Sequence, residues 1–475
     1  MFGKPLASVA AGTATGAAVA GLSSLFLTRL YEPAHFGVLA IAMAATSLAL
    51  AAAAGKFDAA VPLERDDAGA AQTAYAAATC SVAAALATAC LLVAFSPWFA
   101  RLDQIGVVAL ALLPPIVVLA GLVQTGFGLA LRSESYWQVG IGRAVGPSAA
   151  AMIQISLGLF WPSGEALVIG QVMGLLCVSA LLWMHARTRL SWPGWQGLRA
   201  AVQRHWRMPA FMASSNLLTM AGLHAPLVLL GSSFSLATAG IYAVTYRVLT
   251  APALLLGQSI GQVLYARVAR EEAADKQRVL VEQTSGTLFD ISAIVFSWLA
   301  VCAPALFTLA FGERWEASGE YARLLAPWLA ASFVASPISQ YAVVCGRQSA
   351  VLKISLIETA ARALSLGVGL AADSARMLVG SFAAAGAVIS SIYVVWILAL
   401  ADVPWRAWLR QRAASAVTGI VVLGLITLED APGLMVVRIV LTAAAALASA
   451  WIIARRLGYP RRRSMAGASQ RSLSG

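Results

Sequence analysis

Roughly fourteen apolar stretches follow one another along this chain of 475 residues, each long enough to cross a bilayer. They lie at about 6–28, 37–55, 69–95, 105–131, 140–160, 165–184, 209–231, 237–264, 284–311, 322–345, 349–371, 375–400, 413–428 and 433–454. About 20 helical residues span about 30 Å of hydrocarbon, and a helix satisfies its own backbone hydrogen bonds there. The pattern predicts an all-α polytopic membrane protein with about 14 transmembrane helices.

The composition agrees with this class. The chain is 60% hydrophobic and 11% charged, with a mean hydropathy of +0.79, which leaves too few polar residues to cover a soluble domain of this size.

The basic residues predict the orientation, because positive charge is retained on the cytoplasmic side during insertion. Of 33 Lys and Arg, 25 fall on one side of the predicted spans, six on the other, and two, Arg247 and Arg362, deep inside spans. Both termini are therefore expected to be cytoplasmic. The net charge of +12 is mostly this topology signal, so no nucleic-acid partner is expected. The basic segment 185–208, with its three tryptophans, is expected to lie along anionic lipid headgroups.

A short internal repeat predicts the domain organisation. Residues 31–41 have the shape of residues 234–244, offset by 203, and each segment lies between the first two spans of a six-span unit. An even number of spans keeps both units in the same orientation, as in parallel-repeat transporters. The expected division is a six-helix lobe at 1–184, a basic cytoplasmic linker at 185–208, a second six-helix lobe at 209–400, two additional helices at 401–454 and a basic tail at 455–475.

Enzyme motifs are missing from the sequence. There is no GxxxxGK[ST] loop for phosphate, and the four histidines and five cysteines show no metal-ligand spacing. No catalytic residue, cofactor or metal is therefore expected. A membrane glycosyltransferase or polymerase would need a large polar loop for its catalytic centre, and none is predicted.

Two segments resemble the opening of the polysaccharide flippases of the multidrug/oligosaccharidyl-lipid/polysaccharide (MOP) exporter superfamily. Residues 28–37, TRLYEPAHFG, match an RxYxPxxFG-like turn, and residues 55–63, GKFDAAVPL, match a GRYExAI-like stretch. Lys56 and Asp58 stand where Arg and Glu are commoner, which keeps the charges but loses the guanidinium fork.

The resemblance implies a function. It implies that the chain moves an undecaprenyl-pyrophosphate-linked oligosaccharide across the bacterial cytoplasmic membrane by alternating access, for O-antigen, exopolysaccharide or capsule synthesis. Its expected partners are that lipid-linked oligosaccharide, membrane lipids, a proton or sodium ion, and polysaccharide-assembly proteins. The alternatives are a cation-coupled multidrug exporter and a peptidoglycan lipid-precursor flippase of the same superfamily.

Ionisable residues at membrane depth are the strongest site candidates, because each costs about 2.5 to 3.5 kcal/mol on insertion scales. Arg247 is expected near the midplane, either as a cavity cation for phosphate or in a structural ion pair. Arg362 and Glu358 lie four residues apart on one helix face, where they either neutralise each other or bind pyrophosphate and a coupling proton. Asp290 is a capped or solvated acid or a coupling site.

Three further candidates lie near span ends. Arg29 ends the first span, and Lys56 with Asp58 ends the second. Each is either a snorkelling topology anchor or, as the resemblance implies, a residue that binds cargo or compensates charge.

Overall fold

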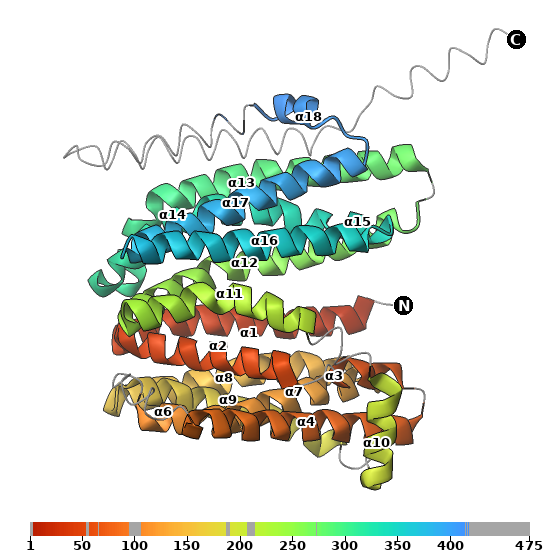
Figure 1. Cartoon of the computed structure of the whole chain (residues 1–475), viewed down its shortest axis with the longest axis vertical. Helices are drawn as coiled ribbons and strands as arrows, with labels where there is room; N and C mark the ends of the chain where they lie inside the picture. The colour runs from red at the N-terminus through yellow and green to blue at the C-terminus, as the bar shows by residue number, and fades with distance from the viewer. Residues whose placement is uncertain are drawn as a thin grey trace, which may run out of the picture. The chain divides into compact units, whose positions relative to one another are not determined.

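All regular structure in the described residues is helical (Figure 1). The computed structural model describes residues 3–53, 57–64, 66–94, 106–186, 191–206, 214–271, 273–413, 415 and 417. The helices are α1 (Gly3–Leu30), α2 (Pro33–Ala53), α3 (Phe57–Ala60), α4 (Asp67–Ala94), α6 (Val107–Ala111), α7 (Leu113–Arg132), α8 (Tyr136–Phe160), α9 (Gly164–Ala186), α10 (Gly194–His205), α11 (Ser214–Ser233), α12 (Leu236–Val268), α13 (Ala274–Phe311), α14 (Glu316–Ile338), α15 (Gln340–Val344), α16 (Gln348–Ala371), α17 (Ala375–Leu400) and α18 (Trp405–Gln411), with 3-10 turns at Val61–Leu63 and Glu313–Trp315.

The first twelve predicted spans all coincide with long helices. Within the described part of the chain, eight segments are long and apolar enough to cross a membrane, in α1, α2, α4, α6 with α7, α9, α13, α16 and α17. Large apolar side chains such as Phe26, Leu86 and Leu364 face outward, as expected of a surface that contacts lipid. The all-α polytopic fold is thereby confirmed. The last two predicted spans and the basic tail lie almost wholly outside the described residues, so the count of fourteen stays a prediction.

Contacts group the chain into two compact units. One comprises Met1–Leu255, Pro304–Tyr321 and Thr359–Phe382, and the other comprises Leu256–Ala303, Ala322–Glu358 and Ala383–Gly475. The boundaries fall inside α12, α13, α14, α16 and α17, so these helices contribute residues to both units. The division into lobes at 1–184 and 209–400 stays a prediction.

The two segments of the internal repeat meet within the first unit. Gly37, near the start of α2, lies against the carbonyl oxygen of Leu236, and Gly240, near the start of α12, lies against the carbonyl oxygen of Pro33. A methyl group on either glycine would overlap backbone atoms of the other helix. Since Gly37 and Gly240 are equivalent positions of the repeat, the repeat marks a point at which two helices touch through bare backbone.

Other residues of the TRLYEPAHFG motif are held by buried contacts of the same unit. Tyr31 is fully buried and donates a hydrogen bond from its hydroxyl to the Gln154 carbonyl at 2.7 Å. The Trp315 indole donates to the Thr28 carbonyl at 2.9 Å, and its ring meets the ring of Phe36 edge-on at 5.2 Å. The motif therefore builds a packed corner between α1 and α2.

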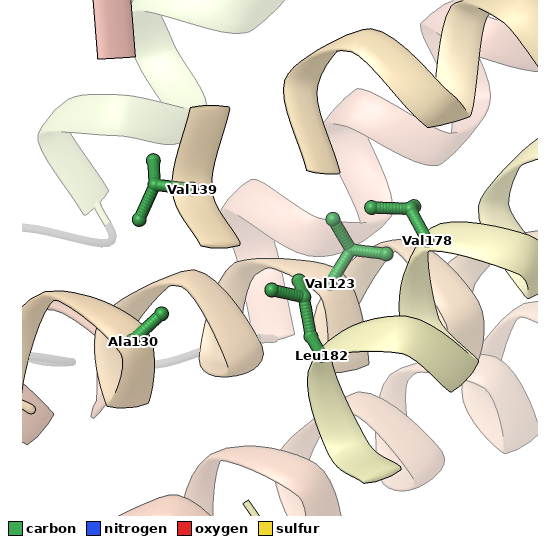
Figure 2. Close-up of a cluster of buried hydrophobic side chains, with 5 residues drawn as sticks. All are labelled: Val123, Ala130, Val139, Val178 and Leu182. Atoms are coloured by element: carbon green, nitrogen blue, oxygen red, sulfur yellow. The ribbon is translucent and has the colours of Figure 1, made fainter. Parts of the chain in front are cut away.

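An apolar cluster fastens α7, α8 and α9 together (Figure 2). Val123 and Ala130 come from α7, Val139 from α8, and Val178 and Leu182 from α9. All five are buried. Their packing fixes one wall of a cavity described below.

Candidate functional site

A cavity of about 980 Å³ lies in the first unit, between α1, α2, α11 and α12, and is also bordered by Phe311. Alanine, leucine and other apolar side chains make up most of its wall. The polar exceptions are Ser24, His224, Tyr242, Tyr246 and Arg247. The Tyr242 and Tyr246 rings stack with centroids 5.9 Å apart. The cavity is thus a mostly apolar chamber, and Arg247 is the one permanently charged side chain that the described residues place on its wall.

Arg247 also lines a second cavity of about 280 Å³, which is more polar. Its wall adds Arg143, Gln154 and Gln171 from α8 and α9. Val123 and Val178 of the cluster in Figure 2 form part of the same wall. The two arginines come from helices far apart in sequence and share this one cavity.

The two arginines are held differently. Arg143 donates to the Thr13 hydroxyl at 3.4 Å, and its guanidinium lies 5.8 Å from the centre of the Phe127 ring. Arg247 makes no hydrogen bond or ion pair with another described residue, and its side chain is exposed. No acidic side chain lines either cavity among the described residues. The site therefore offers guanidinium groups that lack a local counter-charge.

Arg362 lies beside this chamber in the same unit. Its guanidinium packs over the Phe382 ring at 5.3 Å. It is also within electrostatic range of Tyr242 and Tyr246, which line the chamber. Arg362 therefore lies close to two tyrosines that line the same chamber as Arg247.

The remaining predicted residues lie elsewhere. Arg29 is exposed in the last turn of α1, and Glu358 is half-buried in α16. Asp290 is buried in α13 and accepts a hydrogen bond from the Ser415 hydroxyl at 2.6 Å. Lys56 lies outside the described residues. Asp58 is half-buried in α3.

A polar cluster that no sequence pattern predicts holds α10 to the rest of the first unit. Its centre is Glu64, whose side chain is only 8% exposed. Glu64 accepts hydrogen bonds from the Thr73 hydroxyl at 2.8 Å and from Arg204 at 2.9 and 3.0 Å, and its Oε1 lies 2.7 Å from His205 Nε2. Burial alone would raise the pKa of the Glu64 carboxyl. The hydrogen bonds from His205, Thr73 and Arg204, with the Arg204 charge, outweigh burial and lower that pKa below its ordinary value.

Apolar contacts complete the docking of α10, which lies across the other helices of this unit in Figure 1. Leu198 and Ala201 pack against Ala76 of α4. The Trp192 ring, just before α10, meets the Tyr75 ring edge-on at 5.1 Å. The described part of the basic segment, residues 191–206, is therefore docked on this unit through α10, and its role as a linker stays a prediction.

Known structures share this fold. The chain resembles the lipid II flippase MurJ in an inward closed conformation, with a TM-score of 0.73 and 11% identity over 94% of this chain and 99% of that one. It resembles an inward-facing multidrug resistance MATE transporter of the MOP superfamily, with a TM-score of 0.55 and 14% identity over 83% and 94%. A MATE transporter of Vibrio cholerae gives 0.52 and 13% over 86% and 96%. These likenesses show that the chain shares the fold of these proteins.

A match to a family model identifies the family of this chain. Residues 26–320 match the model of a family described as polysaccharide biosynthesis protein. The chain belongs to this family, which confirms the resemblance read from residues 28–37 and 55–63. No curated protein gives a significant sequence match.

Proposed function

We propose that the protein flips undecaprenyl-pyrophosphate-linked oligosaccharide from the cytoplasmic to the periplasmic leaflet of the bacterial cytoplasmic membrane, with both termini cytoplasmic. The observation that carries this proposal is Arg247, a cation that pairs with no described residue and lies on the wall of a mostly apolar chamber of about 980 Å³. Membership of a polysaccharide biosynthesis family and the likeness to a lipid II flippase support it.

The chamber suits a charged head group on an apolar tail. A guanidinium binds phosphate oxygens through paired hydrogen bonds, and such charge-assisted bonds are strong away from water. Arg247 and Arg143 share one cavity and supply two such groups for the two phosphates. The alanine-rich face of α1 gives an apolar surface for the start of the polyprenyl chain.

The other predicted residues take supporting roles in this proposal. Arg362 adds positive charge beside the tyrosines that line the chamber, while Glu358, on the same helix, releases it by taking up a proton. Arg29 guides the head group at the outer end of α1, and Lys56 does so at the inner end of α2. Asp290 compensates charge within α13. Rocking of the predicted lobes 1–184 and 209–400 exposes the chamber to each side in turn.

Leaflet translocation in proteoliposomes tests the proposal. A fluorescent undecaprenyl-pyrophosphate oligosaccharide is placed in one leaflet, and its movement is followed with a quencher. Arg247→Ala is expected to slow translocation by about tenfold to hundredfold, because it removes a charge-assisted contact worth about 1.5 to 3 kcal/mol. Arg376→Ala is the matched control, since Arg376 is exposed and pairs with Glu320. Equal rates in the two variants would contradict the proposal.

A peptidoglycan lipid-precursor flippase is the second candidate, favoured by the TM-score of 0.73 with a lipid II flippase. Lipid II added to the same assay separates the two. Faster movement of lipid II than of the oligosaccharide would favour this candidate. Arg247-independent efflux of a cationic dye, with no lipid movement, would favour a multidrug exporter instead.

A further inference from the structure

The turn between α13 and α14 is the part of these two helices that belongs to the first unit. Residues Pro304–Tyr321 group with that unit, whereas the part of α13 before them and the part of α14 after them group with the second. Phe311, the last residue of α13, borders the chamber of about 980 Å³. A movement that shifts α13 and α14 against the first unit must therefore break the contacts of this turn.

A glycine and a buried tryptophan shape the turn. Gly312 has a φ of +99°, a backbone conformation that residues with a side chain rarely adopt. The 3-10 turn at Glu313–Trp315 follows it directly, and the Trp315 amide donates to the Gly312 carbonyl at 3.0 Å. Trp315 is fully buried. The turn thus buries the largest kind of side chain in the first unit.

Trp315 completes the hydrogen bonding at the end of α1. The Thr28 carbonyl lies in the last turn of α1, where helix carbonyls have no donor within the helix. The Glu32 amide, four residues on, donates instead to His35 Nδ1 at 3.3 Å. The Trp315 indole supplies the donor to the Thr28 carbonyl at 2.9 Å, and its ring meets the Phe36 ring edge-on.

Phe36 connects Trp315 to the cavities of the arginine site. Phe36 lines both the chamber and the smaller cavity that Arg247 shares with Arg143. The other side of the turn is held by α12, because the Thr245 hydroxyl lies 3.2 Å from the Ser318 carbonyl and 2.7 Å from the Ile241 carbonyl. The turn is therefore fastened to α1, α2 and α12, which are helices of the chamber wall.

We propose that Trp315 is a positioning residue that keeps the chamber closed toward the periplasm, and that it leaves the corner of α1 and α2 when the chamber opens to that side. Thr28 lies about 38 Å along α1 from Gly3 at 1.5 Å per residue. With the N-terminus cytoplasmic, this is the periplasmic end of α1. Water can replace both partners of the indole hydrogen bond on opening, so the bond holds the closed state without making it permanent.

The periplasmic side of this contact rests on the orientation in the proposed function, whereas the closure itself can be tested without cargo. Ala243→Cys places a thiol on the chamber wall. A membrane-impermeant maleimide is applied to spheroplasts, which expose the periplasmic face of the full-length protein, or to inverted membrane vesicles, which expose the cytoplasmic face. Labelling of the five native cysteines is measured in protein without the added thiol and subtracted.

Trp315→Ala should raise labelling from the periplasmic face by about tenfold or more. Trp315→Phe keeps an aromatic ring but loses the N–H donor, and should raise it by about fivefold. Labelling from the cytoplasmic face should not rise in either variant, because an alternating-access carrier opens to one side at a time. A variant whose fold is merely loosened would instead be labelled faster from both faces.

Trp161→Phe is the matched control, since it makes the same exchange at an exposed tryptophan that follows α8. It should leave labelling unchanged. Should Trp315→Ala fail to fold, Trp315→Phe carries the test. Unchanged periplasmic labelling in the variant that carries the test, or an equal rise from both faces, would overturn the proposal. The expected labelling in protein that moves no oligosaccharide would support the closure by Trp315 and overturn the proposed function.

Discussion

Glu64 and Asp58 are two acids of the segment that joins α2 to α4, and their surroundings are opposite. Glu64 is surrounded by donors from Thr73, Arg204 and His205. The buried Oδ1 atom of Asp58 accepts no hydrogen bond from a described residue. An acid that accepts several hydrogen bonds fastens together the helices that supply the donors. Glu64 therefore contributes to the docking of α10, whereas Asp58 makes no comparable contact with a described residue.

The two acids should differ most in how much each contributes to the free energy of unfolding. Glu64→Gln leaves Arg204 and His205 facing a neutral amide and should cost about 2 to 3 kcal/mol. This is below the full cost of a buried pair, because Arg204 is 45% exposed and solvent screens its charge. Asp58→Asn should change stability by less than about 1 kcal/mol, because it removes no contact. Chemical unfolding in detergent measures both, and equal losses would break the comparison.

A smaller loss of stability is expected where α4 packs against α7. A methyl group at Gly121 would overlap Ser81 on α4. Gly121→Ala should therefore push α4 and α7 apart and cost about 1 to 2 kcal/mol. Gly21→Ala is the control, since nothing lies within 4 Å of a methyl there. Comparable losses in thermal unfolding of the two variants would rule out this packing account.

The pH dependence of stability should report on Glu64. The pKa of Glu64 in the folded protein lies below its ordinary value of 4.5. The unfolded chain therefore takes up the proton first as the pH falls. The stabilisation from Glu64 is complete above about pH 4.5 and is lost as the pH falls through the lower folded pKa. Thermal unfolding from pH 6 to pH 3 should show a smaller decline in Glu64→Gln, and parallel curves would argue against the network.

The smallest effect is expected in the local stability of α10. Arg204→Ala removes two hydrogen bonds to Glu64 but leaves the apolar contacts of Leu198 and Ala201. Amide hydrogen exchange in α10 should become about fivefold faster, which corresponds to about 1 kcal/mol. Arg199→Ala is the control on the same helix, and an equal increase there would show that Arg204 has no special part in docking α10.

The sequence predicts the helices well and the site only in part. Hydropathy is a local property, so a span predicted at 140–160 appears as α8 (Tyr136–Phe160). Arg247 stands out because a charge inside an apolar run is itself a local signal. Arg143 does not stand out in the sequence, because a basic residue near the end of a span is typical of a topology anchor. That it shares a cavity with Arg247 depends on how α8 and α12 lie in the fold.

The Glu64 cluster could not be predicted for the same reason. Its members Glu64 and Arg204 lie 140 residues apart, and no periodicity connects them. The docking of α10 likewise depends on the face that Ala76 presents on α4. A local sequence pattern indicates where a helix forms, while three-dimensional packing decides which other helices it contacts.

The contact between Gly37 and Gly240 has a mechanical consequence. Helices α2 and α12 approach each other there more closely than side chains would allow, so a rotation of one against the other would be centred on this contact. Ala51 lies about 21 Å along α2 from Gly37 at 1.5 Å per residue. A turn of about 10° about the contact would move Ala51 by about 4 Å. The residues around Gly37 and Gly240 would hardly move in such a rotation, while the other end of α2 would move most.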